Sequence, residues 1–311
     1  MIVADAGEHR ILLFGAGLIG NSILEALSLR TPLAPQFYPF SWNGDHAIQL
    51  ARIEHAATSA SRMSIIWSAG RVGFNATTDE VAQELGVYRD VLRMSARLAS
   101  RIDGVAFHLI SSAGGLFEGQ RHVTSDAIPR PRRAYGHLKL QQEIELAETN
   151  AFAARRVYRV SSAYGPLRPN IRAGLVATLL LNAARREVTH ITGRMETLRD
   201  FVFSGDIGAY VADAVLARTS RDVTDVLASG RPCSLREVQA IVERVVGRRL
   251  HVTFARDADN AEDITFDGSV LPRRWDASDL RWNVSRIYRE AVSAGVIARC
   301  ATAQPSRILI E

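Results

Sequence analysis

The stretch Arg10-Ile-Leu-Leu-Phe14-Gly15-Ala-Gly17-Leu-Ile-Gly20 decides the fold. Its apolar run Arg10–Phe14 is typical of a buried parallel strand, and the residues 21–29 after the glycines favour a helix. A strand, a glycine turn and a helix start in this order let backbone amides hold a pyrophosphate at the helix N-terminus. The stretch therefore predicts a dinucleotide-binding α/β domain, although an ordinary tight turn can carry the same glycines.

This interpretation makes the turn and the next strand the expected cofactor contacts. In NAD-binding folds of this kind an acidic residue about 20 positions further on grips the ribose. The next expected strand, 33–42, ends in Pro39-Phe-Ser-Trp42 without one, so the choice between NAD and NADP stays open. The expected cofactor contacts in this part of the chain are Gly15, Gly17, Leu18, Ile19, Gly20, Ser41 and Asn43.

Two further apolar runs predict parallel strands that end at the same crevice. The run 63–67 leads into Ser68-Ala69-Gly70, small residues that let a cofactor approach the backbone. Only one helical stretch, 46–61, separates this strand from the one before it, so we expect a missing or shortened third strand. The run 105–110 ends in Ser111-Ser112, where a hydroxyl would point into the crevice.

One lysine, Lys139, stands among 37 arginines, four residues after Tyr135. Positions i and i+4 share a helix face, so the ammonium is expected beside the phenol. A nearby cation favours the phenolate and makes Tyr135 a usable general acid/base, with Ser112 holding the same substrate oxygen. The alternatives are a surface lysine placed there by chance and a polar turn at Ser112.

A long helix over 79–101 is predicted by apolar residues on one stripe, and this stripe serves either the core or a dimer face. The stripe consists of Val81, Leu85, Tyr88, Leu92 and Leu98.

Composition favours a soluble, cytoplasmic protein. The chain has 311 residues, 47% of them hydrophobic, a formal net charge of +5, and no apolar run near 18 residues or signal-peptide pattern. Cys233 and Cys300 lack metal or redox spacing, so neither a structural disulfide nor a metal site is expected. Because the basic residues are dispersed, we expect no nucleic-acid partner.

Four motifs in order resemble the extended short-chain dehydrogenases/reductases of the nucleotide-sugar epimerase/dehydratase group. Ser112 and Tyr135-x-x-x-Lys139 match that family's catalytic residues, and the resemblance implies that Tyr135 and Lys139 also contact the cofactor, with Lys139 on the nicotinamide ribose. The segment 159–166, Arg-Val-Ser-Ser-Ala-Tyr-Gly-Pro, is similar to its Arg-Pro-x-Asn-x-Tyr-Gly-Pro. The segment 199–206, Arg-Asp-Phe-Val-Phe-Ser-Gly-Asp, is similar to its Arg-Asp-Phe-Val-His-Val-x-Asp.

The resemblance implies a Rossmann-type doubly wound parallel sheet with a smaller C-terminal substrate domain. The expected bounds are 1–165 for the NAD(P)-binding domain, with 197–220 crossing back to it, and mainly 166–311 for the substrate domain. It also implies a nucleotide-sugar substrate, bound in part by Ser111, Ser162 and Arg199, with Arg199 on the diphosphate. Arg159 stays ambiguous between a phosphate contact and a structural role. A homodimer through the helices at 79–101 and 136–154 and a role in polysaccharide biosynthesis follow from the same resemblance.

Three departures narrow the implied reaction. Phe14 replaces the first glycine of the family's usual turn, and Ser162 stands where an asparagine commonly contacts the nucleotide. Ala113-Gly114 replace the Asp-Glu pair of the 4,6-dehydratases, which disfavours dehydration because no extra acid and base are present. The resemblance therefore favours an NAD-dependent 4-epimerase similar to UDP-sugar 4-epimerases, with an NADPH-dependent 4-keto-sugar reductase as the alternative. A non-catalytic, cofactor-sensing protein on the same fold is a third possibility.

Overall fold

A computed structural model describes residues 1–38, 40, 42, 44–57, 60–73, 76–172, 174–217, 220–255 and 262–297. Cys300 therefore lies outside the described residues. The chain divides into two compact units, which are described separately. Unit 1 contains Met1–Leu116, Pro129–Arg159 and Ile207–Val226. Unit 2 contains Phe117–Ile128, Val160–Asp206 and the described residues from Leu227 onward.

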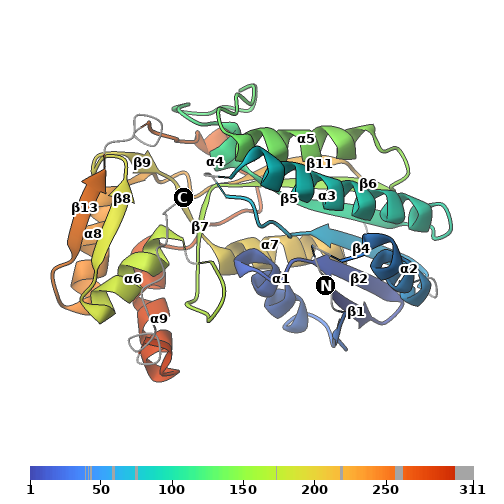
Figure 1. Cartoon of the computed structure of the whole chain (residues 1–311), viewed down its shortest axis with the longest axis horizontal. Coiled ribbons are helices and arrows are strands. Elements are labelled where there is room, and N and C mark those ends of the chain that lie inside the picture. Colours follow the sequence, from blue (N-terminus) through green and yellow to red (C-terminus); the bar gives the residue numbers. More distant parts are fainter. Residues whose placement is uncertain are drawn as a thin grey trace. The chain divides into compact units, whose positions relative to one another are not determined.

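A seven-stranded sheet with the order β11-β6-β5-β4-β2-β1-β3 forms the centre of unit 1 (Figure 1). The pairs β2–β4 and β4–β5 are parallel, as expected from the buried apolar runs. The expected Rossmann-type α/β fold is confirmed. The strands are β1 (Ile2–Ala6), β2 (His9–Phe14), β3 (Gln36–Phe37), β4 (Arg62–Trp67), β5 (Val105–Ser112), β6 (Ala154–Val160) and β11 (Val223–Leu227).

One edge of this sheet differs from the sequence prediction. Residues 2–6, for which the sequence pattern predicts no element, form β1, which pairs antiparallel with β2 through a turn at Gly7, φ 66°. The predicted strand at 33–42 is wrong in extent, because its described part contains only the two-residue β3, antiparallel to β1. The antiparallel strands β1 and β3 thus lie on one side of β2, with β3 at the edge, and β4 follows β2 directly on the other side.

Helices cover both faces of the sheet in unit 1. Figure 1 shows α3 and α5 side by side over one face, with α1 and α7 against the other. On that second face a Cβ at Gly208 would overlap the Ser22 carbonyl oxygen, so α7 and α1 pack closely. The helices are α1 (Leu18–Ser28), α2 (His46–Ala57), α3 (Thr78–Ala99), α4 (Ala113–Leu116), α5 (Ala134–Glu148) and α7 (Ser204–Leu216).

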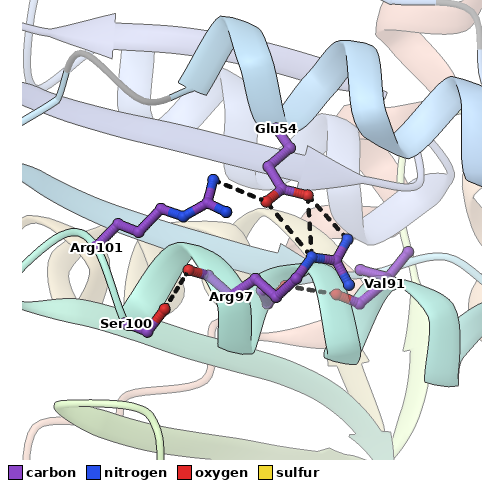
Figure 2. Close-up of polar contacts among 6 residues, drawn as sticks. Glu54, Val91, Arg97, Ser100 and Arg101 are labelled. Carbon is purple, nitrogen blue, oxygen red and sulfur yellow. Dashed lines mark hydrogen bonds and ion pairs between the residues drawn. The ribbon is translucent and has the colours of Figure 1, made fainter.

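The predicted long helix at 79–101 is confirmed as α3, and it begins with a capping box. Thr77 Oγ1 accepts from the Glu80 N–H, and the Glu80 carboxylate accepts from the Thr77 N–H. Near its other end Glu54 of α2 accepts hydrogen bonds from Arg97 and Arg101 (Figure 2). Because both guanidinium groups are more than half exposed, these pairs hold α2 beside α3 with little net stabilisation.

Unit 2 has its own core, to which α6, α8, α9 and β10 contribute. The carboxylates of the 199–206 motif serve the local structure there. Asp200 is fully buried and accepts from the N–H groups of Ser229 and Gly230, and Asp206 accepts from both the N–H and the hydroxyl of Ser278. The elements are β7 (Ser162–Tyr164), α6 (Leu175–Arg185), β8 (Val188–Thr192), β9 (Leu198–Arg199), β10 (Phe201–Phe203), β12 (Cys233–Ser234), α8 (Leu235–Val246), β13 (His251–Ala255), the 3-10 turn η1 (Gly268–Val270) and α9 (Leu280–Ser293).

Within the described ranges, no helix combines the length and the apolar character that crossing a membrane requires.

Candidate dinucleotide and catalytic site

The glycine turn after β2 is packed against the loop after β4. Gly15 has φ 95°, and a Cβ there would lie 2.5 Å from Ala69 Cα and overlap the Ala69 nitrogen. A Cβ at Gly20 would overlap the Gly15 carbonyl oxygen. Asn21 Nδ2 fixes the turn by donating to the Ala16 and Gly17 carbonyls, at 2.6 and 2.9 Å. Close backbone approach therefore requires glycine at positions 15 and 20.

A cavity of about 270 Å³ opens over this turn. Gly17 lines it with an open face, since a Cβ built there meets no atom within 4 Å. Typical small-ligand pockets hold roughly 300–1,000 Å³, so this cavity suits part of a dinucleotide. A glycine cradle at the start of α1 fits a phosphate group held by backbone amides. The lining residues are Met1, Phe14, Gly15, Ala16, Gly17, Phe40, Trp42, Trp67, Ser68, Ala69 and Gly70.

The cavity contains five of the predicted cofactor contacts: Gly15, Gly17, Ser68, Ala69 and Gly70. Leu18 and Ile19 begin α1 and are not among the lining residues, and Gly20 is buried beneath the turn. Ser41 and Asn43 lie outside the described residues. The described lining residues include no acid and no arginine. The rings of Phe40 and Trp67, which contact the Phe14 ring, form an aromatic part of the cavity wall.

Two glycines bring α4, which follows Ser112, against the start of α5. A Cβ at Gly136 would overlap the Gly115 carbonyl oxygen, and a Cβ at Gly115 would lie 3.0 Å from Tyr135 Cδ1. Ser112 is 8% exposed at the end of β5, and its Oγ accepts from the Gly115 N–H at 3.0 Å. The Ser112 hydroxyl proton is thus left for another acceptor. Gly115 therefore contacts both Ser112 and Tyr135, and the shared role of their hydroxyls on one substrate oxygen stays a prediction.

Lys139 lies one helical turn after Tyr135 on α5, as expected, with Nζ 5.7 Å from the centroid of the Tyr135 ring. The residue is only 5% exposed, which excludes the alternative of a surface lysine. Nζ donates to Gln142 Oε1 at 3.1 Å and lies 3.8 Å from Glu84 Oε1. Burial lowers the pKa of the Lys139 ammonium, while the carboxylates of Glu84 and Glu143 act to raise this pKa.

Glu84 is the residue that sequence reasoning missed. It is 2% exposed on α3, although the predicted stripe placed its neighbour Leu85 on the buried face. Glu84 stands four residues before Tyr88, which is fully buried. This spacing was the signal in the sequence: a carboxylate one turn before the buried Tyr88 ring lies near the core, where a charge requires a partner.

Glu143 is a second acid that the sequence analysis did not predict near the site, and it gives Arg159 a structural role. The Arg159 guanidinium pairs with Glu143 at 2.7 Å, and Ser111 Oγ donates to the same carboxylate at 2.5 Å. Arg159 therefore has a structural partner within unit 1. The predicted substrate contact of Ser111 stays a prediction, with its hydroxyl engaged by Glu143 in this structure.

Ser162 and Arg199, the other predicted substrate contacts, belong to unit 2. The Ser162 N–H donates to the Asp200 carbonyl at 3.0 Å, so both predicted residues lie on neighbouring segments. Arg199 Nη1 donates to the carbonyls of Leu198, at 3.0 Å, and Glu262. Their roles with substrate stay predictions.

Unit 2 also contains a second cavity of about 270 Å³, near the C-terminal ends of α6 and α8. The arginines around it serve those helix ends. Arg248 Nη1 donates to the Ala183 carbonyl at 3.4 Å, and Arg249 pairs with Glu243 at 3.5 Å. Cations at helix C-termini are stabilising without any ligand, so these arginines have a structural role.

A dinucleotide-binding sheet with a tyrosine and a lysine one turn apart on a following helix defines the class of short-chain dehydrogenases/reductases. A family model described as the NAD dependent epimerase/dehydratase family matches residues 48–225, more than half of the chain, and the chain belongs to this family. No curated protein matches the chain by sequence.

Several solved structures share the fold. The UDP-glucose 4-epimerase of Thermus thermophilus with NAD has a TM-score of 0.74 and 18% identity, covering 90% of this chain and 99% of that one. MoeE5 in complex with UDP-glucose and NAD has the same TM-score and identity, covering 93% and 99%. RMD from Pseudomonas aeruginosa with NADPH has a TM-score of 0.74 and 16% identity, covering 93% and 100%. At these identities the likeness is one of fold.

Proposed function

We propose that the protein is an NAD(P)-dependent nucleotide-sugar epimerase that oxidises the sugar at C4 and then reduces it on the other face. The observation that carries this proposal is the Tyr135 and Lys139 pair on α5, linked through Gly115 to Ser112. One of the solved relatives, MoeE5, is a complex with UDP-glucose and NAD, which supports a nucleotide sugar as the substrate class.

The residues divide the acid–base work between them. A bound nicotinamide supplies the transfer of hydride from and to the sugar. Tyr135 takes the proton of the C4 hydroxyl and returns it when the carbonyl is reduced. Ser112, whose Oγ already accepts from the Gly115 N–H, donates a hydrogen bond to the same substrate oxygen and keeps its own proton. The Lys139 ammonium stabilises the Tyr135 phenolate.

Cofactor and substrate phosphates have separate candidate partners. The turn at Gly15 and Gly17 would hold the dinucleotide pyrophosphate, and Ser68, Ala69 and Gly70 would border the cofactor. Arg199 would bind the substrate diphosphate, because a guanidinium recognises phosphate oxygens in pairs. The absence of an Asp-Glu pair at Ala113-Gly114 favours epimerisation over dehydration.

An NADPH-dependent 4-keto-sugar reductase is the second candidate. No acid occurs among the described residues that line the cavity, so nothing there selects the free ribose hydroxyls of NAD. The similarity of fold to RMD with NADPH gives the same alternative. Ser112, Tyr135 and Lys139 serve both reactions equally.

The first experiment is to denature the purified protein and to identify and quantify any released nucleotide by mass spectrometry. An epimerase consumes no net hydride and keeps its cofactor, so we expect near-stoichiometric NAD. The protein should then interconvert C4 epimers of a nucleotide hexose without added cofactor. A protein that is purified empty, is stabilised against heat by NADPH and consumes it once per turnover would establish the reductase instead.

We also propose a homodimer formed through the segments 79–101 and 136–154, in a cytoplasmic enzyme that supplies sugars for surface polysaccharides. Ile144 on α5 is 43% exposed, and such an apolar side chain favours a partner surface. Light scattering on Ile144→Glu tests the dimer: loss of a dimer seen in the wild type supports it, and a monomeric wild type contradicts it.

A further inference from the structure

Glu84 connects two parts of the site that are distant in sequence. Its Oε2 accepts from the N–H groups of Arg71 and Val72, at 2.8 and 3.0 Å. Its Oε1 is buried, has no hydrogen-bond partner among the described residues, and lies 3.8 Å from Lys139 Nζ. One carboxylate thus contacts the chain just after the cavity wall with one oxygen and faces the ammonium with the other.

The other groups around Lys139 either have partners of their own or are neutral. Glu143, on the same helix, pairs with Arg159 of β6 and accepts from Ser111 of β5. Gln142 and the Tyr135 ring, both on α5, are neutral contacts of Nζ. From α3 only Glu84 faces the ammonium with an oxygen that has no other partner among the described residues.

We propose that Glu84 is the positioning residue that keeps the Lys139 ammonium charged and couples it to the segment Gly70–Val72. Gly70 lines the dinucleotide cavity, and a Cβ there would lie 3.4 Å from Glu84 Oε1. A ligand that contacts this segment and fixes its position therefore also fixes the position of the Glu84 carboxylate beside Lys139. The assignment of a catalytic benefit rests on the proposed function, whereas the charge coupling is a property of the folded chain.

The alternative is that Glu84 only satisfies two backbone amides. A neutral glutamine oxygen accepts the same two hydrogen bonds at equal length, so that role needs no charge. Burying a carboxylate is costly unless a cation or donors compensate it. Glu84→Gln consequently removes the interaction with Lys139 and spares the amide contacts.

The single lysine makes the titration of Lys139 directly observable. Protein labelled with ¹³C,¹⁵N-lysine carries one labelled side chain, and its ¹³Cε shift reports the charge on Nζ as pH is varied. An opposite charge this close shifts a pKa by about 1–3 units, so we expect the midpoint to fall by at least about one pH unit in Glu84→Gln. Glu54→Gln, which removes a carboxylate paired with Arg97 and Arg101 instead, should leave the midpoint unchanged.

An unchanged midpoint in Glu84→Gln overturns the proposal, as does an equal fall in Glu54→Gln. If Glu84→Gln does not fold, Glu84→Asp replaces it: the shorter carboxylate should lower the midpoint by a smaller, measurable amount, and no change again refutes the coupling. Adding NAD to wild-type protein should move the Lys139 signal, and this response should be smaller in Glu84→Gln.

Activity measurements separate this proposal from the proposed function. If the protein turns over a nucleotide sugar, the high-pH limit of kcat should move down with the Lys139 midpoint in Glu84→Gln. A purely structural role would lower the melting temperature and leave the pH profile in place. If no nucleotide sugar is turned over while the midpoint still shifts, the proposed function fails and the charge coupling stands.

Discussion

Gly136→Ala is the sharpest test of how α5 is placed. A Cβ at this position would overlap the Gly115 carbonyl oxygen and lie 2.8 Å from Pro131 Cβ. Alanine gains roughly 1 kcal/mol of helix propensity over glycine, whereas forced overpacking costs about 1–3 kcal/mol. The net loss of unfolding free energy is therefore up to about 2 kcal/mol, or several degrees in Tm.

Gly86→Ala in α3 is the matched control. Nothing lies within 4 Å of a Cβ at Gly86, so the same change there should stabilise the protein by about 0.5–1 kcal/mol. A calorimetric Tm above the wild type for Gly86→Ala and below it for Gly136→Ala is the expected result.

The catalytic effect of Gly136→Ala should exceed its effect on stability. A displacement of about 1 Å between Tyr135 and Ser112 costs on the order of 100-fold in rate. Trp42 and Trp67 line the cavity, so quenching of their fluorescence reports cofactor affinity, which should change less than about threefold because the glycine turn is untouched. Gly136→Ala protein that matches Gly86→Ala in Tm and the wild type in kcat would refute this account of the packing.

Three further predictions concern the cradle, the catalytic pair and a buried histidine. Gly15→Ala should lower both Tm and cofactor affinity because its Cβ has no space, while Gly17→Ala should weaken binding at unchanged Tm; thermal shift with and without NAD distinguishes them. Tyr135→Phe and Lys139→Arg should each reduce turnover by more than about 100-fold while the far-ultraviolet circular dichroism stays that of the wild type. Burial lowers the pKa of His108 to about 3, so the neutral form is stabilised in the fold, and stability should fall as pH drops from about 6.5 towards 3. Urea unfolding of His108→Asn at several pH values in this range should show a smaller fall of the unfolding free energy with pH than the wild type shows. An equal fall would contradict the assignment.

The parts of the fold predicted from sequence were those with strong local patterns. Buried parallel strands appear as continuous apolar runs, and each predicted run ends in glycine, serine or alanine near the crevice. The pair at positions 135 and 139 followed from helix geometry alone. These patterns fix which residues share a helix face or follow a strand end, while the joint role of Ser112, Tyr135 and Lys139 stays a prediction.

The β1 hairpin and the acids around Lys139 depend on contacts between distant segments. β1 pairs with β2 through the turn at Gly7 and with β3 on its other side, so its place in the sheet depends on these partners rather than on a local pattern. Glu84 was missed because the buried face of α3 is wider than the predicted stripe: Tyr88, Leu92 and Leu98 are buried as predicted, and Glu84 is buried beside them. The sequence alone offered no way to decide which of several acids would approach Lys139.

The structure gives a reason for the single lysine in a chain otherwise built with arginine. An ammonium has three N–H donors. Lys139 Nζ donates to Gln142 Oε1 and lies near Glu84 Oε1, and the side chain is buried. A guanidinium has five donors in a planar fork, so Lys139→Arg would leave at least two more buried N–H groups to satisfy, at roughly 1–3 kcal/mol each. Arginine also stays charged at every working pH, whereas the charge on a buried lysine responds to its counter-ion. The same burial that makes arginine costly at this position is what makes Lys139 sensitive to Glu84.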